Sequence, residues 1–341
     1  MKHARYRICA PLLVALLIGP AQAEDCLLVP VLKGNWWQIA PNAPDVGDLR
    51  TGEANACDFA IFQAGDGSWR CISCIRGTKA PGQRLFYQWK SDRLTDKNWT
   101  PLGILEVERG EVGTPPQRTS VQAPHPLVWG GKWYLFYNSY GARCLVGDDG
   151  IHWKQHKNAN GQTRFFDMGR DVHVFRDEPH HRWIAYYCGT LKGPDGKRGA
   201  MVARTAPALE GPWSKEEPAV RTEGNPESPF VVLHQGRYYL WQQMSIYASA
   251  DPLDFNSAPL VAHMTGLWFN GKFAPEIVEH EGQWYVGGYS RGIHIAKFVW
   301  EVRTLADIAS WQAKWTAYLR EEERKRRERE EARKRAADAA K

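Results

Sequence analysis

Four acidic residues stand at the start of short apolar runs that recur along this chain. They are Asp58, Asp171, Glu227 and Glu276, and a fifth run carries His125 there. Singly, each acid would serve as a turn-capping or salt-bridged residue. Brought together, like charges repel, so one carboxyl holds its proton while another stays ionised. Glycosidic hydrolysis needs that division, with one carboxyl donating a proton and another acting as nucleophile or as base for water. The set therefore predicts sugar hydrolysis if the fold brings it together.

The apolar runs belong to a weak repeat that occurs five times. In each copy a polar turn follows the run and leads into a strand rich in aromatic residues. These strands open with Trp69, Trp133, Trp183, Tyr238 and Trp284, which lie 46 to 64 residues apart. A unit of about 50 residues with Gly, Asp and Pro turns is typical of a propeller blade made of four short antiparallel strands. The sequence therefore predicts an all-β fold, a five-bladed β-propeller with a charged C-terminal α-helix.

The predicted architecture decides where the acids lie. In a propeller the first strand of each blade lines the central channel, and the start of that strand points into the channel mouth. We expect the segment Cys26–Gly52 to supply a closing strand and the strand at 292–299 to end the fifth blade. We assign residues 24–304 to the propeller domain.

The N-terminal segment reads as an export signal. Three basic residues, Lys2, Arg5 and Arg7, precede an apolar run, and Ala21-Gln22-Ala23 forms a small-x-small cleavage pattern. We expect residues 1–23 to be a signal peptide cleaved after Ala23. The mature protein would then be secreted or periplasmic, without membrane association.

The C-terminal segment, residues 305–341, predicts a helix. Trp311, Trp315 and Leu319 recur at helical spacing and would pack against the propeller. Beyond Arg320 the chain is almost wholly charged, with Glu and Arg mixed at i, i+4 spacing. This pattern indicates a solvated helix or tail, with a partner-binding arm as the alternative.

Charge and cysteine content narrow the partners. The net charge of +6 owes much to the C-terminal segment, so the main domain gives no case for nucleic-acid binding. Six cysteines remain after the predicted cleavage: Cys26, Cys57, Cys71, Cys74, Cys144 and Cys188. An exported chain permits disulfides, but sequence does not select the pairs. Cys71 and Cys74 lie in one strand facing opposite sides, which favours core cysteines or a long-range bridge over a zinc site. We expect no metal and no cofactor.

Three motifs around the acids resemble those of a known enzyme group. Arg170-Asp171-Val172 is similar to an Arg-Asp-Pro motif, and Pro226-Glu227-Ser228-Pro229 to a Glu-Cys motif. Asp58, in Ala56-Cys57-Asp58-Phe59, falls where an Asn-Asp-Pro nucleophile motif would lie. The chain thereby resembles the five-bladed propeller hydrolases of glycoside hydrolase families 32 and 43 over residues 50–300, with acid spacings of 113 and 56 residues that suit family 32.

The resemblance implies a role for each motif residue. Asp58 would be the nucleophile, or the general base if the enzyme inverts the anomeric configuration. Asp171 would hold sugar hydroxyls and steady the transition state, and Glu227 would be the general acid. The remaining substrate-binding candidates are Gln122, His125, Arg170, His173 and Glu276. Arg170 would keep a neighbouring carboxylate ionised or bind a hydroxyl, and His173 would touch a ligand or pack in the core.

The motifs also depart from the family pattern. The first lacks its Asn and Pro, Val172 replaces Pro, Ser228 replaces Cys, and no C-terminal β-sandwich follows the propeller. The expected partner is an oligo- or polysaccharide whose sugar the sequence leaves open, as it does the stereochemical outcome and the oligomeric state. Two alternatives to hydrolysis stand: a non-catalytic carbohydrate-binding propeller and a propeller glycoside phosphorylase.

Overall fold

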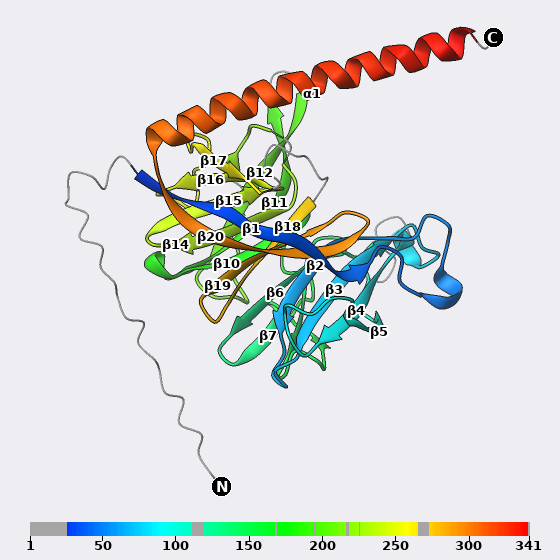
Figure 1. Ribbon diagram of the computed structural model, residues 1–341. Coiled ribbons are helices and arrows are strands. Elements are labelled where there is room, and N and C mark those ends of the chain that lie inside the picture. Colours follow the sequence, from blue (N-terminus) through cyan, green and yellow to red (C-terminus); the bar gives the residue numbers. More distant parts are fainter. Residues whose placement is uncertain are drawn as a thin grey trace.

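The computed structural model describes residues 26–339, apart from 111–118, 168, 194–195, 216–217, 225 and 265–272. The predicted signal peptide, residues 1–23, lies outside this part. The described residues form five four-stranded antiparallel sheets arranged radially, which confirms the predicted propeller (Figure 1). Each inner strand contacts the inner strands of both neighbouring sheets, so the ring is closed.

The first three blades each use four consecutive strands. Blade 1 contains β2 (Asn55–Gln63), β3 (Trp69–Arg76), β4 (Arg84–Ser91) and β5 (Thr100–Leu105). Blade 2 contains β6 (Gln122–Trp129), β7 (Lys132–Asn138), β8 (Ala142–Gly147) and β9 (Lys154–Gln155). Blade 3 contains β10 (Arg170–Asp177), β11 (Arg182–Gly193), β12 (Gly196–Ala206) and β13 (Ala219–Arg221). Short 3-10 helices lie at Gly47–Leu49, Pro81–Gln83 and Glu178–His180.

The last blade joins the two ends of the propeller chain. Blade 4 contains β14 (Pro229–His234), β15 (Arg237–Gln242), β16 (Ser245–Ser249) and β17 (Leu260–His263). Blade 5 contains β18 (Phe273–His280), β19 (Gln283–Tyr289), β20 (Gly292–Thr304) and, as its outer strand, β1 (Cys26–Pro41). The predicted closing strand is therefore confirmed, since β1 pairs along most of β20. The strand that starts at Gly292 is third in its sheet, because β1 covers its outer edge.

The aromatic repeat has a physical reason in the contacts between blades. Each aromatic residue that begins a second strand touches the first hairpin of the preceding blade. Two do so through hydrogen bonds: the indole of Trp133 donates to the carbonyl of Gln63 at 2.8 Å, and the Tyr238 hydroxyl to Asp177 at 2.6 Å. The other three make ring contacts: Trp69 with His280, Trp183 with Trp129 and Trp284 with His234. The repeat thus marks the interlock between neighbouring sheets.

The apolar core follows the same radial plan. Five buried clusters lie in the described part of the chain, one between each pair of neighbouring blades. Cys71 packs in the cluster between blades 5 and 1, and Cys74 in the one between blades 1 and 2. Their side chains therefore face opposite sides of β3, as the sequence predicted. All six cysteines from Cys26 to Cys188 are free thiols.

The helix α1 (Leu305–Ala339) leaves the end of β20 and packs on blade 4 at its start. Trp315 is buried and stacks on His263 of β17, and Trp311 stacks on Trp315. The expectation that Leu319 packs on the propeller is wrong: the residue is 46% exposed, and it is Tyr318 that stacks on Trp315. The later turns of α1 project beyond the blades (Figure 1). No helix among the described residues has the length and apolar character that crossing a bilayer requires.

Candidate active site

The entry to each inner strand carries the same irregularity, and it positions the acids. In blades 1, 2, 3 and 5 the pairing register with the second strand shifts across a four-residue segment, for example between Arg170 and His173. The second residue of the segment adopts a left-handed conformation in four blades. These residues are Ala123, Asp171, Ser228 and Ala274, with φ of 46° to 59°. Such bulges turn side chains away from the alternation of a regular strand.

The acids occupy four successive positions of this bulge rather than one equivalent place. Glu227 holds the first position of its blade, and its carbonyl accepts a hydrogen bond from the Gln243 backbone at 3.0 Å. Asp171 holds the second position, Asp58 the third and Glu276 the fourth. The expectation of acids in matching register is therefore corrected. Because of this stagger, the carboxyls of Glu227, Asp171 and Asp58 reach the channel mouth from different positions of the bulge.

We call Asp58, Asp171, Glu227 and Arg170 the mouth layer. Arg170 holds Glu227 through both guanidinium nitrogens, with Nη2 donating to Oε1 at 2.5 Å, and Nη1 also lies 3.4 Å from Asp171 Oδ2. The Asp171 carboxylate accepts the Ser228 backbone N–H at 3.2 Å and the Cys188 thiol at 3.4 Å. Two acids from neighbouring blades thus share one cation.

Burial divides the protonation states of this layer. Asp171 is only 6% exposed, and burial together with the negative charge of Asp58 raises its pKa to about 7, against the opposing pull of Arg170. Asp58 keeps part of its side chain accessible, yet burial raises its pKa as well, with Arg84 opposing the shift and Glu227 adding to it. Near neutral pH the Asp171 carboxyl can therefore either hold or release a proton, as acid–base chemistry requires.

The fourth bulge positions form a second layer beneath the mouth, which we call the channel ring. Its members are Phe59, His125, His173, Phe230 and Glu276. The His125 ring lies 4.3 Å from His173, centroid to centroid, and His173 lies 4.3 Å from Phe230. Each histidine bonds the next blade: His125 Nε2 lies 3.0 Å from the Val174 carbonyl, and His173 Nε2 accepts the Val231 N–H at 3.0 Å. The ring therefore closes the channel with packed side chains.

Comparison with known proteins places this fold. No family model matches the chain, and no curated protein does. Among solved structures it is similar to Zg3597, a family 117 glycoside hydrolase from the marine bacterium Zobellia galactanivorans, with a TM-score of 0.54 and 16% identity over 80% of this chain and 91% of that one. It is also similar to a thermostable family-43 glycoside hydrolase, with a TM-score of 0.51 and 14% identity over 74% of this chain and 94% of that one. A third is the catalytic domain of a Coprinopsis cinerea GH62 α-L-arabinofuranosidase, with a TM-score of 0.54 and 12% identity over 77% and 96% of the two chains.

The chain has the fold of the five-bladed propeller glycoside hydrolases. At these identities the likeness concerns the architecture, so the roles of individual residues rest on the geometry of this site.

The other sequence candidates lie at different depths of this glycoside-hydrolase-like propeller. Gln122 holds the first bulge position of blade 2, the position of Arg170 in blade 3, and bonds Ser120 at 3.2 Å. His125 and Glu276 line a small central pocket together with Asp58 and Asp171. His173 is fully enclosed in the channel ring, where it packs in the core. Burial lowers the pKa of His125 to about 4 and lowers the pKa of His173 well below its ordinary value, so both rings are neutral at pH 7.

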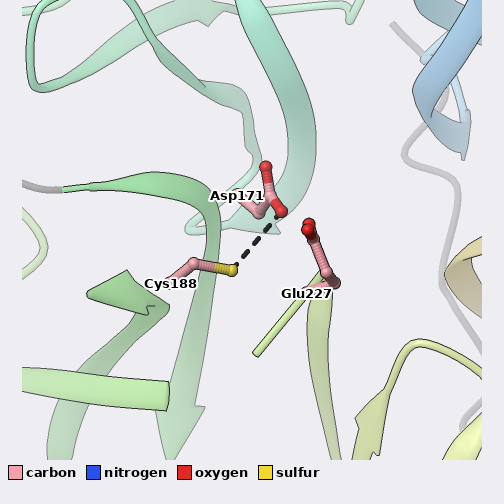
Figure 2. A group of neighbouring side chains, drawn as sticks. All are labelled: Asp171, Cys188 and Glu227. Atoms are coloured by element: carbon pink, nitrogen blue, oxygen red, sulfur yellow. Dashed lines mark hydrogen bonds between the residues drawn. The ribbon is translucent and has the colours of Figure 1, made fainter. Parts of the chain in front are cut away.

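One three-residue group in the mouth has ligand atoms close enough for a metal. Oxygens of Asp171 and Glu227 and the sulfur of Cys188 all lie within 4.8 Å of one another (Figure 2). Figure 2 shows the Cys188 thiol directed at Asp171 and Glu227 rising beside them from the neighbouring blade. Burial raises the pKa of the Cys188 thiol well above its ordinary value, and Arg170 already supplies the cation for both carboxylates. This donor set suits a hydrogen-bonded network better than a cation.

Cys188 and Arg84 contribute to the site without having been predicted. Cys188 pairs with Arg170 across β10 and β11, and counting outward from the turn at 178–181 would have placed it beside the Arg-Asp motif. Arg84 begins β4 and acts on Asp58 from blade 1. Its sequence surroundings carry no motif, so only the sheet pairing reveals it.

Proposed function

We propose that the protein is an exported glycoside hydrolase that cleaves its substrate between Asp58 and Glu227. The observation that carries this proposal is the mouth layer itself, in which Asp171 and Glu227 share Arg170 and Asp58, from a third blade, interacts electrostatically with both acids. Buried like charges are costly, and acid–base catalysis gives such an arrangement a use.

The arrangement of the three acids favours Asp58 and Glu227 as the reacting pair. Carboxyl pairs that flank a glycosidic bond stand roughly 5–5.5 Å apart in retaining enzymes and about 6.5–9.5 Å apart in inverting ones. Asp171 and Glu227 have oxygens within 4.8 Å of each other and both bond Arg170, so they form one hydrogen-bonded group. Asp58, on the other side of the channel mouth, is therefore the partner of Glu227, and Asp171 tunes the pair.

Two cavities would hold the reactants, one the water and the other the sugar. The central pocket that Asp58 lines has about 30 Å³, which suits one or two water molecules. A second cavity of about 830 Å³, within the size range of ligand sites, is lined by blades 1 and 5 and includes Arg76 and Arg84, which act electrostatically on Asp58. A sugar in the larger cavity would present its glycosidic carbon to a water activated by Asp58.

Glu227 would donate the proton to the leaving oxygen, and Arg170 would keep Glu227 ionised until the substrate binds. A guanidinium fork pairs with an ionised carboxylate. Sugar hydroxyls that draw Arg170 away would leave Glu227 next to Asp171, whose raised pKa makes it a proton source near pH 7. Asp171 would be left ionised beside Arg170, and the cycle would close when Asp58 releases to solvent the proton taken from water and Asp171 regains one from solvent.

The test is Glu227→Gln, assayed on a panel of plant and algal polysaccharides and on aryl glycosides with activated leaving groups. Reducing-sugar release from polysaccharide should fall at least about 10²–10⁴-fold, while aryl glycosides, whose leaving groups need no proton, should lose much less. Glu279→Gln, exposed at the opposite end of β18, is the matched control. Equal activity of Glu227→Gln and wild type on polysaccharide would remove Glu227 from the acid role.

A second candidate function follows from the same fork. Arg170 holds Glu227 through both nitrogens, which would suit a carbohydrate-binding propeller in which Glu227 is a fixed hydroxyl acceptor. Calorimetric binding of oligosaccharides by the wild type without any release of product would favour this candidate.

A further inference from the structure

The cavity beside Asp58 is lined by an unusual number of cations. Three arginines face it, Arg76 and Arg84 from blade 1 and Arg291 from blade 5, against a single acidic residue, Glu53. Polar groups such as Asn55 and Gln83 fill much of the remaining wall. An open cavity with three guanidinium groups and one carboxylate has a strongly positive field, which draws anions.

The backbone places two of these arginines directly opposite each other. Arg76 ends β3, Arg84 begins β4, and the two are Cα partners in the antiparallel pair. Like charges at such a cross-strand pair are destabilising. A third cation comes from the turn between β19 and β20, where Arg291 adopts a left-handed conformation with φ of 51°. Three separate segments thus accept an energetic cost to bring positive charge to one place.

The described residues supply little to neutralise this charge. Arg76 donates from Nε to the Asn55 amide oxygen at 2.8 Å, and Arg84 Nη1 lies 3.9 Å from the Cys74 sulfur. Both partners are uncharged. Within the described ranges, no ion pair joins Arg76, Arg84 or Arg291 to a carboxylate, whereas Arg170 nearby holds two. Among the described residues, the three arginines that line the cavity therefore keep their positive charge without a paired carboxylate.

We propose that this cavity binds an oxyanion carried by the substrate, a carboxylate or sulfate on the sugar unit next to the cleaved bond. The inference rests on the proposed function, since it assigns the substrate class of the same site. Guanidinium forks match planar and tetrahedral oxyanions with two donors each. The cavity volume of about 830 Å³ accommodates a whole sugar unit, far more than a free phosphate ion needs. Phe273 and Tyr289 add an aromatic wall, with ring centroids 5.7 Å apart.

The position of the arginines also fits the charge of the catalytic acids. An acidic sugar approaching Asp58 would be repelled by it, and Arg84 and Arg76 already act on Asp58 electrostatically. They would offset that repulsion and fix the ring over the acid. A free phosphate bound by the same arginines would instead replace water as the attacking group, and the experiment separates these two sources of oxyanion.

The test measures binding and turnover separately on the full chain. The inactive Glu227→Gln protein is titrated calorimetrically with oligogalacturonides, sulfated galacto-oligosaccharides and neutral galacto-oligosaccharides at about 0.15 M salt. One acidic series should bind at least about tenfold more tightly than the neutral one, as a charge-assisted bond predicts. Adding Arg291→Gln should remove about tenfold of that preference and leave neutral binding unchanged. Arg237→Gln, in the turn at the far end of blade 4, is the matched control.

Each remaining outcome has a defined meaning. Equal binding of acidic and neutral sugars, or an Arg291→Gln protein indistinguishable from the control, overturns the inference. Wild-type turnover that depends on inorganic phosphate and yields a sugar 1-phosphate also overturns it, because the arginines would then hold phosphate. Tight binding of acidic sugars without any turnover by the wild type would keep this inference and refute the proposed hydrolysis.

Discussion

The mouth layer and the channel ring lie within three residues of each other where the inner strands begin, yet their side chains make different kinds of contact. The Asp171 carboxylate in the mouth layer accepts hydrogen bonds from a thiol, a backbone N–H and a guanidinium, so two of its three partners are ionisable groups. His173, two residues on, is enclosed by rings and bonded to the backbone of the next blade. The bulge between them separates a layer whose protons can move from a layer whose side chains are fixed.

This difference shows how a propeller accommodates an active site at low cost. The side chains of the channel ring pack the blades together at the centre, so the side chains of the mouth layer are not needed for packing. Gly287 illustrates how tightly the ring is filled, since a Cβ there would come within 2.8 Å of the Phe59 ring and 3.3 Å of Glu276. Substitutions in the mouth layer should therefore reduce activity, and substitutions in the channel ring should reduce stability.

The largest effect is expected for Asp58→Asn in the mouth layer. The amide cannot accept a proton from water or attack a sugar, so kcat should fall about 10³-fold or more. Unlike Glu227→Gln, this variant should lose activity on activated aryl glycosides as well as on polysaccharides. Circular dichroism and urea unfolding should show a retained fold. Aryl glycoside hydrolysis at the wild-type rate would show that Asp58 belongs to neither role.

A smaller effect, on stability instead of chemistry, is expected for His173→Ala in the channel ring. The change leaves a cavity beside Phe230 and removes the acceptor of the Val231 N–H, which together should cost about 2–4 kcal/mol in unfolding free energy. Activity per folded molecule should stay within about threefold. His152→Ala, whose side chain is 87% exposed, is the control. A loss of activity as large as that of Asp58→Asn would break the division between the layers.

The stability of the protein should also depend on pH through one buried acid in each layer. Burial raises the pKa of Glu276 well above its ordinary value, and that of Asp171 to about 7. In each case the folded state holds a proton that the unfolded state releases near pH 4, so stability is fully present below pH 4 and declines as pH rises toward the folded pKa.

Glu276→Gln removes the contribution of one acid to this decline. The unfolding free energy of the variant minus that of the wild type should therefore be about 1–3 kcal/mol larger at pH 8 than at pH 4, measured by urea titration at both values. Parallel curves for the two proteins across this range would mean that Glu276 titrates normally.

Much of this architecture was predictable because the sequence repeat follows from the contacts between neighbouring blades. The aromatic residue after each first hairpin touches the preceding blade, so five such residues predicted five interlocked sheets, and Cys26–Gly52 supplied the closing strand as expected. The inner-strand acids were predicted for the same reason. Their stagger was not, since the bulge is set by backbone conformation at residues such as Ala123 and Ala274, whose type carries no turn signal.

The cations of the site were harder to predict than its acids. Arg170 stands next to Asp171 within a motif, whereas Arg76 and Arg84 become neighbours only through the register of β3 with β4. Arg291 reaches the same cavity from the last blade, more than 200 residues further along the chain. Convergence of this kind depends on ring closure, which a linear pattern does not encode.

The smallest effect is expected far from both layers, in the charged part of α1. Its arginines and glutamates pair with one another at i, i+3 and i, i+4, as in Arg324 with Glu321 at 2.7 Å, and those side chains are about half exposed. Such pairs stabilise the helix by about 0.3–0.5 kcal/mol each and contribute nothing to the blades. Deleting residues 321–341 should therefore shift the propeller's Tm by less than about 2 °C. Trp315→Ala, which empties the contact with His263, should by contrast cost about 3 kcal/mol. A large Tm shift on deletion would show that the later turns of the helix stabilise the propeller, and the division between a packed start and a solvated end would fail.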